Sequence, residues 1–394
     1  MKIAILTSGI LPVPAVRGGA VENLIDFILE YNHLHQLHDI TIYSIADQAT
    51  TQHPALQSAI NHYHYIDVSS PITKIQKRLF HFLNRHKEYY HYTIDFFLQK
   101  AIKHIRRQHY DIIIMENRPG YALKLKDITD AKLVYHLHND KLSTHTPNYY
   151  EIYDAAHSII TVSNYIKSCV QTINPNDTKT ITVHNGIDLA RFSRRERPHI
   201  SREQLGLSPD DFIMVFSGRI NRDKGVEELI EAMLRLQDIP QIKLLVIGST
   251  FFGSSSNEDD FVRSLKTKAQ SIQQRIIFTG FVPYDQMPDY LQLANIAVIP
   301  SIWDDPFPTT VLEAQAMGLP IITTRRGGIP EEVTEGNAIL LDTNDSFVEN
   351  LSAAILNLYN HPEKRKQMSE GALANSKYYN HKRYAEDFFN ALKI

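Results

Sequence analysis

The sequence predicts an α/β protein made of two Rossmann-like domains that face one another across a cleft. A chain of 394 residues exceeds one ordinary α/β core, so two domains are expected. Strand-like apolar runs alternate with helix-like stretches from end to end, which is typical of βαβ units and parallel sheets. The alternation is interrupted by a polar, irregular stretch over 188–211 and then restarts, which indicates a domain junction.

Each half of the chain carries its own series of predicted elements. Strands of the first half are expected at 2–7, 40–45, 111–115, 133–138, 158–162 and 181–184. Strands of the second half are expected at 212–216, 242–247, 276–279, 296–300, 319–323 and 338–341. Predicted helices of the second half lie at 224–237, 284–293, 310–317, 345–359, 361–376 and 381–392. Because parallel sheets bind ligands at the carboxyl ends of their strands, functional motifs are expected there.

The composition is that of a soluble globular protein, with 43% hydrophobic and 22% charged residues. The only cysteine, Cys169, excludes an internal disulfide and a multi-cysteine metal site. No apolar run is long enough to cross a bilayer, and residues 1–7 favour a first strand over a signal peptide. The expected location is therefore the cytoplasm.

One region is strongly basic in a chain whose formal net charge is −3. Residues 72–109 carry nine Lys or Arg and two acids, with five histidines and several aromatic residues among them. A solvated helical face would account for this pattern. An equally weighted interpretation is a surface that meets anionic lipid or a charged acceptor, with peripheral attachment to the inner face of the cell membrane. Nucleic acid is not expected as a partner.

Two absent motifs narrow the chemistry. No two glycines are spaced as G-x-G, which argues against a nicotinamide dehydrogenase. No two aspartates are spaced as D-x-D, so the compact pair that carries a metal–diphosphate in other sugar transferases is missing. Another group must therefore neutralise any bound diphosphate, and no metal or cofactor is expected.

The first candidate motif follows an apolar strand and opens a helix, over residues 217–225. Arg219 and Lys224 fall in the loop at the carboxyl end of that strand. Arginine offers phosphate oxygens a planar fork and lysine a mobile point charge, so together they can replace a metal ion. The alternative is an ordinary loop with surface charges, with Asp223 capping the helix.

The second candidate motif covers residues 299–324, where a strand, a tight loop and a helix start follow one another. Backbone N–H groups at a helix start form an anion site. Asp305 and Glu313 lie on either side of this start, and carboxylates can accept hydrogen bonds from ribose or sugar hydroxyls. Two alternatives remain open: Asp305 as an exposed loop acid, and Thr310-x-x-Glu313 as a capping box.

Together these motifs resemble glycosyltransferase family 4. The resemblance rests on Arg219-x4-Lys224-Gly225, on Asp305-Pro-Phe-x5-Glu313-Ala-x-Ala-x-Gly318-x-Pro320 and on Gly327-Gly328-Ile-Pro-Glu. The run 11–20, with Gly18 and Gly19, is similar to a bacterial branch that includes spore-coat and capsule transferases, and 184–188 with Phe192 resembles the end of the family's first domain. Residues 46–110 are the least similar to the family.

The resemblance implies the GT-B fold, with residues 1–190 as an acceptor domain, 191–210 as a linker and 211–376 as a nucleotide-sugar domain. A C-terminal helix at about 377–394 would cross back to the N-terminal domain. The implied activity is retaining, metal-independent transfer of a hexose from a nucleotide diphosphate donor, UDP by family frequency, to a glycan or lipid-linked acceptor. Surface polysaccharide such as capsule or lipopolysaccharide is the implied product.

The resemblance also implies roles for individual residues. Arg219 and Lys224 would hold the diphosphate, while Gly18 and Gly19 would let their loop approach the donor closely. Asp305 would contact the transferred sugar, Glu313 the ribose, and His138, at the end of the strand 133–138, the reacting centre. The remaining donor contacts would be the backbone amides near Thr309, Thr310 and Val311, for the β-phosphate, and Phe281 and Val282, beside the base.

Two departures from the family pattern bear on the donor. The family usually has glutamate at 305, and Asp305 is one methylene shorter. It usually has glycine at 308, and Pro308 has no N–H to donate. For His138 the alternative is a histidine of the core, since 16 of the 19 histidines precede residue 190 and His136 shares its strand face.

Transfer in this family is thought to proceed by front-face attack, in which the leaving diphosphate helps to take the acceptor proton. The protein then contributes charge stabilisation and positioning rather than a nucleophile. Two other functions remain as alternatives: a non-catalytic GT-B partner subunit, and a sugar-nucleotide 2-epimerase of the same fold. The complete Arg219, Lys224 and Glu313 set argues against the partner subunit.

Overall fold

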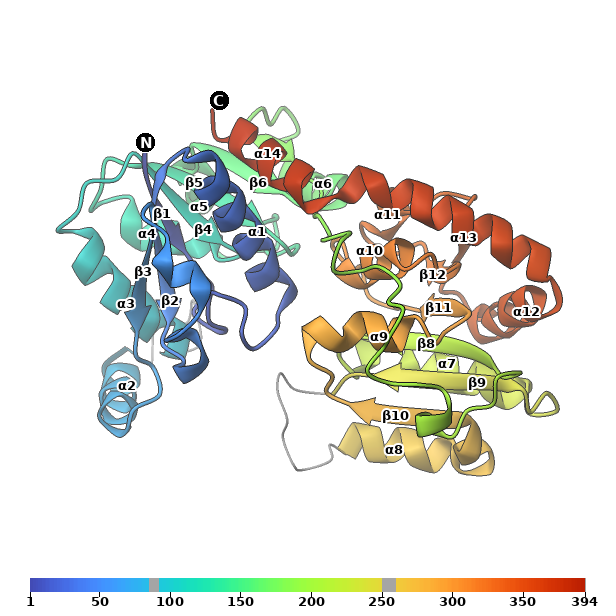
Figure 1. Ribbon diagram of the computed structural model, residues 1–394. Helices are drawn as coiled ribbons and strands as arrows, with labels where there is room; N and C mark the ends of the chain where they lie inside the picture. Colours follow the sequence, from blue (N-terminus) through green and yellow to red (C-terminus); the bar gives the residue numbers. More distant parts are fainter. Residues whose placement is uncertain (85–91, 250–259, 394) are drawn as a thin grey trace. The chain divides into compact units, whose positions relative to one another are not determined.

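The computed structural model describes residues 1–84, 92–249 and 260–393, and it confirms the predicted α/β fold class (Figure 1). The chain divides into two compact units. The first comprises Met1–Asn185 together with Lys382–Ile394, and the second comprises Gly186–His381. Each unit contains one wholly parallel sheet flanked by helices, as expected of a Rossmann-like domain.

The sheet of the first unit has seven strands in the order β3-β2-β1-β4-β5-β6-β7. Its central strands are near-continuous apolar runs, which suits strands that are covered on both faces. Register is set by pairs such as Ile5 with Ile42 on one side and Ile5 with Ile114 on the other. The strands are β1 Lys2–Leu6, β2 Asp39–Ile45, β3 Asn61–Ile66, β4 Ile112–Glu116, β5 Lys132–Leu137, β6 Ser158–Thr161 and β7 Thr180–Thr182.

The helices of the first unit are α1 Ala20–His35, α2 Pro71–Asn84, α3 Tyr92–Ile105, α4 Ala122–Leu125, α5 Tyr149–Ala155, α6 Asn164–Gln171 and α14 His381–Ala391. Helix α14 packs on this unit, as predicted for the C-terminal helix. Its Phe388 and Phe389 join a buried cluster with Ile28 of α1 and with Ile3 and Ile5 of β1.

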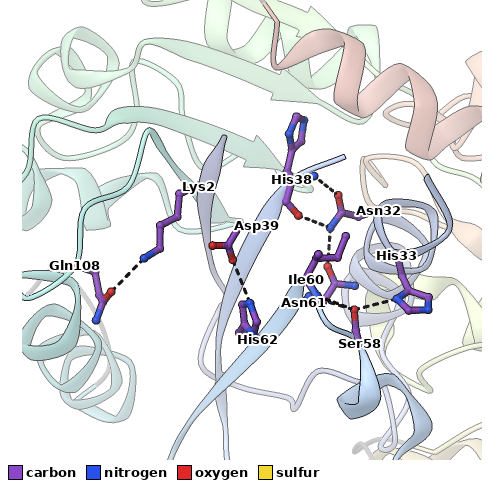
Figure 2. A network of polar contacts seen from close by, with 10 residues as sticks. All are labelled: Lys2, Asn32, His33, His38, Asp39, Ser58, Ile60, Asn61, His62 and Gln108. Atoms are coloured by element: carbon purple, nitrogen blue, oxygen red, sulfur yellow. Dashed lines mark hydrogen bonds and ion pairs between the residues drawn. The ribbon is translucent and has the colours of Figure 1, made fainter. Parts of the chain in front are cut away.

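Strand β3 was not predicted from the sequence. Among the described residues it is an edge strand paired with β2, so its Asn-His-Tyr-His-Tyr-Ile pattern is less apolar than that of the central strands. Figure 2 shows the polar network at its amino end. Asn32 of α1 donates to Asn61 Oδ1 at 2.7 Å, and Ser58 Oγ contacts both His33 Nδ1 at 3.0 Å and the Asn61 backbone at 3.1 Å. This network fixes the amino end of β3, which is the end opposite the carboxyl ends of the strands.

The sheet of the second unit has six strands in the order β10-β9-β8-β11-β12-β13. The strands are β8 Phe212–Ser217, β9 Ile242–Ile247, β10 Ile276–Gly280, β11 Ile296–Ile299, β12 Ile321–Thr324 and β13 Ala338–Leu341. The helices are α7 Val226–Arg235, α8 Asp260–Lys268, α9 Met287–Leu291, α10 Thr309–Ala316, α11 Ile329–Glu332, α12 Phe347–Asn360 and α13 Pro362–Ser376. One continuous apolar core joins β8, β9 and β11 to α7 and α12.

Within the residues that the structure describes, no helix is both long and apolar enough to cross a membrane. Of the charged residues in the predicted basic region 72–109, Arg106 and Arg107 follow α3, and Arg85, Lys87 and Glu88 lie outside the described residues. The others fall on α2 and α3. Helix α3 contributes buried residues such as Phe97 and Ile105 to the first unit. Helix α2 differs, because its large apolar side chains are mostly exposed.

Candidate functional site

The loop between β8 and α7 is packed directly against the end of β11. Gly225 has a φ of +71°, and a Cβ on it would come within 1.9 Å of the Pro300 carbonyl oxygen. The backbone of Ile302 donates to the Asp223 carbonyl at 3.0 Å. Only glycine permits both this conformation and this approach. The loop carrying Lys224 is thereby held beside the loop that follows β11.

This packing brings two of the predicted site residues into contact. Lys224 Nζ donates to Asp305 Oδ2, and the two side chains are only 20% and 8% exposed. The ammonium also lies 5.7 Å from the centre of the Trp303 ring. Asp305 is therefore not the exposed loop acid of the alternative interpretation. The structure thus places Lys224, predicted to contact the diphosphate, beside Asp305, predicted to contact the sugar.

The Gly327-Gly328 pair supports the backbone of Asp305. A Cβ on Gly327, whose φ is +55°, would come within 2.2 Å of the Asp305 carbonyl oxygen. The Gly328 N–H donates to the same oxygen at 2.8 Å. The two glycines therefore let the loop before α11 lie directly on the Asp305 loop, which accounts for this part of the motif.

The start of α10 corrects one interpretation of the sequence. Pro308 is the N-cap residue and no side chain caps the helix, so the capping box predicted for Thr310 and Glu313 is wrong. The helix begins at Thr309, two residues earlier than that motif requires, because Thr310 as the N-cap would place the first helical residue at Val311. The Val311 N–H, a predicted phosphate donor, donates to the Pro308 carbonyl at 3.0 Å. Thr310 lies close to the β8 loop, with its methyl 4.0 Å from where a Cβ on Gly218 would be.

Glu313 is buried and hydrogen-bonded to two side chains near the start of α10. It is 4% exposed, and its burial raises the pKa of the carboxyl to about 8, against the opposing effect of hydrogen bonds with Thr309 and Tyr284. A carboxylic acid that is largely protonated near neutral pH can both donate and accept a hydrogen bond. It is thus suited to a vicinal diol such as that of a ribose.

Tyr284 was not identified from the sequence. It follows β10 by four residues, and burial and the nearby Glu313 raise the pKa of its hydroxyl well above the usual range. Phe281, predicted to border the base, is 41% exposed, whereas Val282 is buried. An exposed aromatic ring at the carboxyl end of a strand offers a stacking surface. Arg219 is exposed in the same unit, in the loop after β8.

The predicted site residues of the first unit lie at the carboxyl ends of β1 and β5. Gly18 and Gly19 precede α1 with φ values of +74° and +106°. A Cβ on Gly19 would come within 2.2 Å of Oε2 of Glu22, whereas Gly18 faces open space. Burial, with smaller contributions from Glu116 and Asp26, raises the pKa of Glu22 to about 7. Glycine is required at 19 for both backbone conformation and space.

His138, which follows β5, belongs to a buried polar cluster. Its Nε2 lies 3.1 Å from Glu116 Oε2, and His136 Nδ1 lies 3.0 Å from the same oxygen. Burial lowers the pKa of His138 to about 4. Burial opposes ionisation of Glu116, but the two histidines lower its pKa to about 2. Glu116 was missed in the sequence, where an acid ending the apolar run Ile-Ile-Ile-Met was the available signal.

Within the described part of the chain, the side chains of this cluster are the group that could together bind a metal ion. Ligand atoms of Glu116, His136 and His138 all lie within 4.8 Å of one another. The hydrogen bond from His138 Nε2, with His136 Nδ1 approaching the same carboxylate oxygen at 3.0 Å, also accounts for this arrangement. The expectation that the protein works without a metal stays a prediction.

Comparison with known proteins agrees with this architecture. The family model described as Glycosyltransferase Family 4 matches residues 31–191, and that described as Glycosyl transferases group 1 matches residues 199–374. The putative glycosyltransferase YtcC of Bacillus subtilis (strain 168) is 30% identical over 87% of this chain and 80% of its own. Spore coat protein SA of the same organism is 28% identical over 85% and 84%.

Solved structures show the same fold. Anabaena Alr3699/HepE, crystallised in complex with UDP, superimposes with a TM-score of 0.74 at 22% identity over the full length of both chains. WaaG, a glycosyltransferase involved in lipopolysaccharide biosynthesis, gives 0.68 at 14% identity over 98% of each chain. The two parallel-sheet units and these likenesses define a GT-B fold. The chain belongs to glycosyltransferase family 4, in the branch that includes spore coat protein SA.

Proposed function

We propose that the protein is a retaining, metal-independent glycosyltransferase that moves a hexose from a UDP-sugar to a glycan or lipid-linked acceptor in bacterial surface polysaccharide synthesis. The observation that carries the proposal is the contact between Lys224 and Asp305, in the same unit as the buried Glu313. Cations, sugar-binding carboxylates and a helix start are the groups that a nucleotide diphosphate sugar requires.

The second unit supplies the donor contacts in this proposal. Lys224 and Arg219 offset the charge that develops on the leaving diphosphate, which is the largest contribution expected of such a site. Glu313 forms hydrogen bonds with the ribose hydroxyls, and Phe281 lies beside the base. A UDP complex of HepE and a UDP-glucose complex of the same protein support UDP as the nucleotide.

In this proposal the first unit contributes His138 and the glycines before α1 to the transfer reaction. His138 lies at the carboxyl end of β5, and Gly18 and Gly19 lie in the loop after β1. The ring of His138 is neutral near pH 7, because burial lowers its pKa to about 4. It therefore acts by hydrogen bonding and positioning rather than as a cation.

The direct test is transfer with purified protein and a panel of radiolabelled UDP-sugars, with lipid extracts or oligosaccharides as acceptors. A labelled product with the donor's anomeric configuration, formed in the presence of a strong chelator, supports the proposal. Release of free UDP with epimerised sugar would instead identify a 2-epimerase. If no donor is hydrolysed, transferred or bound, the protein is a non-catalytic partner subunit.

We further propose that α2 attaches the protein to an anionic membrane surface. Five large apolar side chains of this helix are between 59% and 70% exposed: Ile72, Ile75, Leu79, Phe82 and Leu83. Their spacing places them in a single stripe about 100° wide on an α-helix. Lys74 and Arg78 are exposed on the same helix.

An apolar stripe of this size on one helix is costly in water and is typical of helices that lie in the membrane interface. The exposed cations attract anionic headgroups, at about 1 kcal/mol for each residue near the surface. Helix α2 is held to α3 by Lys100, whose Nζ lies 3.3 Å from Gln76 Oε1. The stripe therefore adds an apolar contribution to the electrostatic attraction predicted from residues 72–109.

A further inference from the structure

We propose that Glu116 and Asn117, consecutive residues at the end of β4, are positioning residues that hold His138 for the transfer reaction. This inference rests on the proposed function, because it assigns His138 a place at the reacting centre. Glu116 acts on the ring of His138, and Asn117 acts on its backbone. Neither residue is expected to touch the substrate.

The contact to the ring is buried and directional. Glu116 is 0% exposed and lies opposite His136 in the β4–β5 register. Its Oε2 is 3.1 Å from Nε2 of His138 and 3.0 Å from Nδ1 of His136. A buried carboxylate is retained only where hydrogen-bond donors surround it. Glu116 therefore favours the tautomer of His138 that carries its proton on Nε2, the nitrogen that is hydrogen-bonded to the carboxylate.

The choice of tautomer determines what His138 can do. With the proton on Nε2 and bonded to Glu116, its other ring nitrogen, Nδ1, is left as a hydrogen-bond acceptor. An acceptor at this place suits a hydroxyl of the sugar, which donates a proton. It disfavours a sugar carboxylate, which has no proton to donate. The cluster thus predicts that His138 accepts a hydrogen bond from a hydroxyl of the donor sugar.

The contact to the backbone is an independent observation. Asn117 Oδ1 accepts a hydrogen bond from the backbone N–H of His138 at 3.1 Å. Asn117 has a φ of +58°, a left-handed conformation that few residues other than glycine adopt. Its own N–H donates to the His136 carbonyl at 2.8 Å, which continues the ladder between β4 and β5. The turn after β4 thereby aims the Asn117 amide at His138.

Helix α14 closes the cluster on its other side. The His136 ring lies 5.0 Å from the ring of Phe388 and 6.4 Å from that of Tyr384, between ring centres. Within the described residues Tyr384 Oη has no hydrogen-bond partner, and neither does Glu116 Oε1. Because aromatic rings fill this side, His136 is confined, and the Glu116 oxygen that it shares with His138 is fixed in turn.

The experiment uses the full-length protein with the UDP-hexose that gives product. We expect Glu116→Gln to lower kcat by about tenfold to a hundredfold, the range seen when the group that orients a histidine is removed, with the KM for the donor little changed. Asp95→Asn is the matched control, because Asp95 is also buried in the first unit but pairs with Lys124. Equal losses of kcat and of melting temperature in both variants would overturn the positioning role.

A second pair of variants keeps the test open if Glu116→Gln does not fold. Asn117→Gly retains the left-handed backbone but removes the amide, so we expect a lower kcat at normal stability. Asn117→Asp keeps an acceptor oxygen and should retain most of the activity. Wild-type kcat in Asn117→Gly would overturn the backbone part of the proposal.

A spectroscopic measurement separates this proposal from the proposed function. Nitrogen-15 spectra of the imidazoles should show an Nε2-protonated ring that is absent from His138→Ala and altered in Glu116→Gln, whether or not any donor is turned over. An Nδ1-protonated His138 would overturn the inference. Tight, stoichiometric binding of Zn²⁺ to the wild-type protein that is lost in Glu116→Gln would also overturn it, because a metal ion would replace the hydrogen bond between Glu116 and His138.

Discussion

Lys224 and Asp305, which are 81 positions apart in the chain, form a hydrogen-bonded ion pair between the loops that follow β8 and β11. Both side chains are largely shielded from water. The two charges neutralise each other, and a donor sugar nucleotide would bring a diphosphate to Lys224 and hydroxyls to Asp305. The pair thus holds both side chains in place before the donor arrives, which reduces the ordering required on binding.

Removing the lysine should cost both activity and stability. We expect Lys224→Ala to lose about 1.5–3 kcal/mol of transition-state binding, the range for hydrogen bonds to charged groups. It should also lower the melting temperature, because Asp305 is left buried without its partner. The double variant Lys224→Met with Asp305→Asn should recover stability without activity. Steady-state kinetics and calorimetry on the three variants measure the two effects separately, and unchanged turnover in Lys224→Ala would refute the assignment.

The cation pair also predicts indifference to metal removal. If Arg219 and Lys224 take the place of a metal ion, dialysis against a strong chelator should leave turnover unchanged, and added Mg²⁺ or Mn²⁺ should not raise it. Initial rates before and after chelation measure this. A loss of activity that a divalent cation restores would show that the protein uses a metal.

Glu313→Gln tests the buried acid of α10 through its dependence on pH. The folded-state pKa of Glu313, about 8, lies above its ordinary value of 4.5. The folded protein therefore binds this proton more tightly, and the resulting stability is fully present below about pH 4.5 and is lost as pH rises through about 8. Near pH 7 we expect a near-normal melting temperature but weaker UDP-sugar binding for the variant.

The sign of the pH effect provides the control. At pH 9, above the folded-state pKa of about 8, the wild type has an ionised, buried Glu313 and the glutamine variant does not. The variant should then be the more stable protein. Thermal melts from pH 5 to pH 9 measure this crossing. Parallel curves for the two proteins would contradict the raised pKa.

The two glycines before α1 should differ in their tolerance of a side chain. Gly18→Ala meets only the cost of a left-handed conformation, about 1 kcal/mol, because no neighbouring atom lies within 4 Å of the added Cβ. Gly19→Ala should cost more, since the added Cβ meets the Glu22 carboxyl and Leu11. Urea denaturation of the two variants ranks them. Equal free energies of unfolding would show that the Glu22 side chain moves aside freely.

The attachment of α2 to membranes predicts two separable effects. Leu79→Ser with Phe82→Ser should weaken binding to anionic vesicles at every salt concentration, because the apolar stripe is lost. Lys74→Gln with Arg78→Gln should weaken it mainly at low salt, where charges are least screened. Sedimentation with neutral and with anionic vesicles measures both. Equal partitioning to the two lipids, or none to either, would leave α2 as an ordinary solvated face.

The sequence alone determined the fold class and where the candidate residues of the second unit lie among its strands and helices. Continuous apolar runs that alternate with helix-like stretches predict parallel strands, because such strands are buried on both faces. Lys224 and Asp305 could be assigned to loops because an apolar strand precedes each, and Glu313 could be assigned to the helix that follows the second loop. Glycines such as Gly225 and Gly327 could be recognised as motif positions.

Only the tertiary structure decided what these residues contact. Strand β3, at the sheet edge, lacks the apolar run that marks a buried strand, and the apolar stripe of α2 is found only when exposure is measured. The Lys224–Asp305 pair and the Glu116–His138 contact join loops from different strands, and the start of α10 at Thr309 removes the capping box. The spacing of apolar and turn residues along the chain determines the helices, strands and turns. Contacts between distant loops depend instead on how the strands are ordered in the sheet.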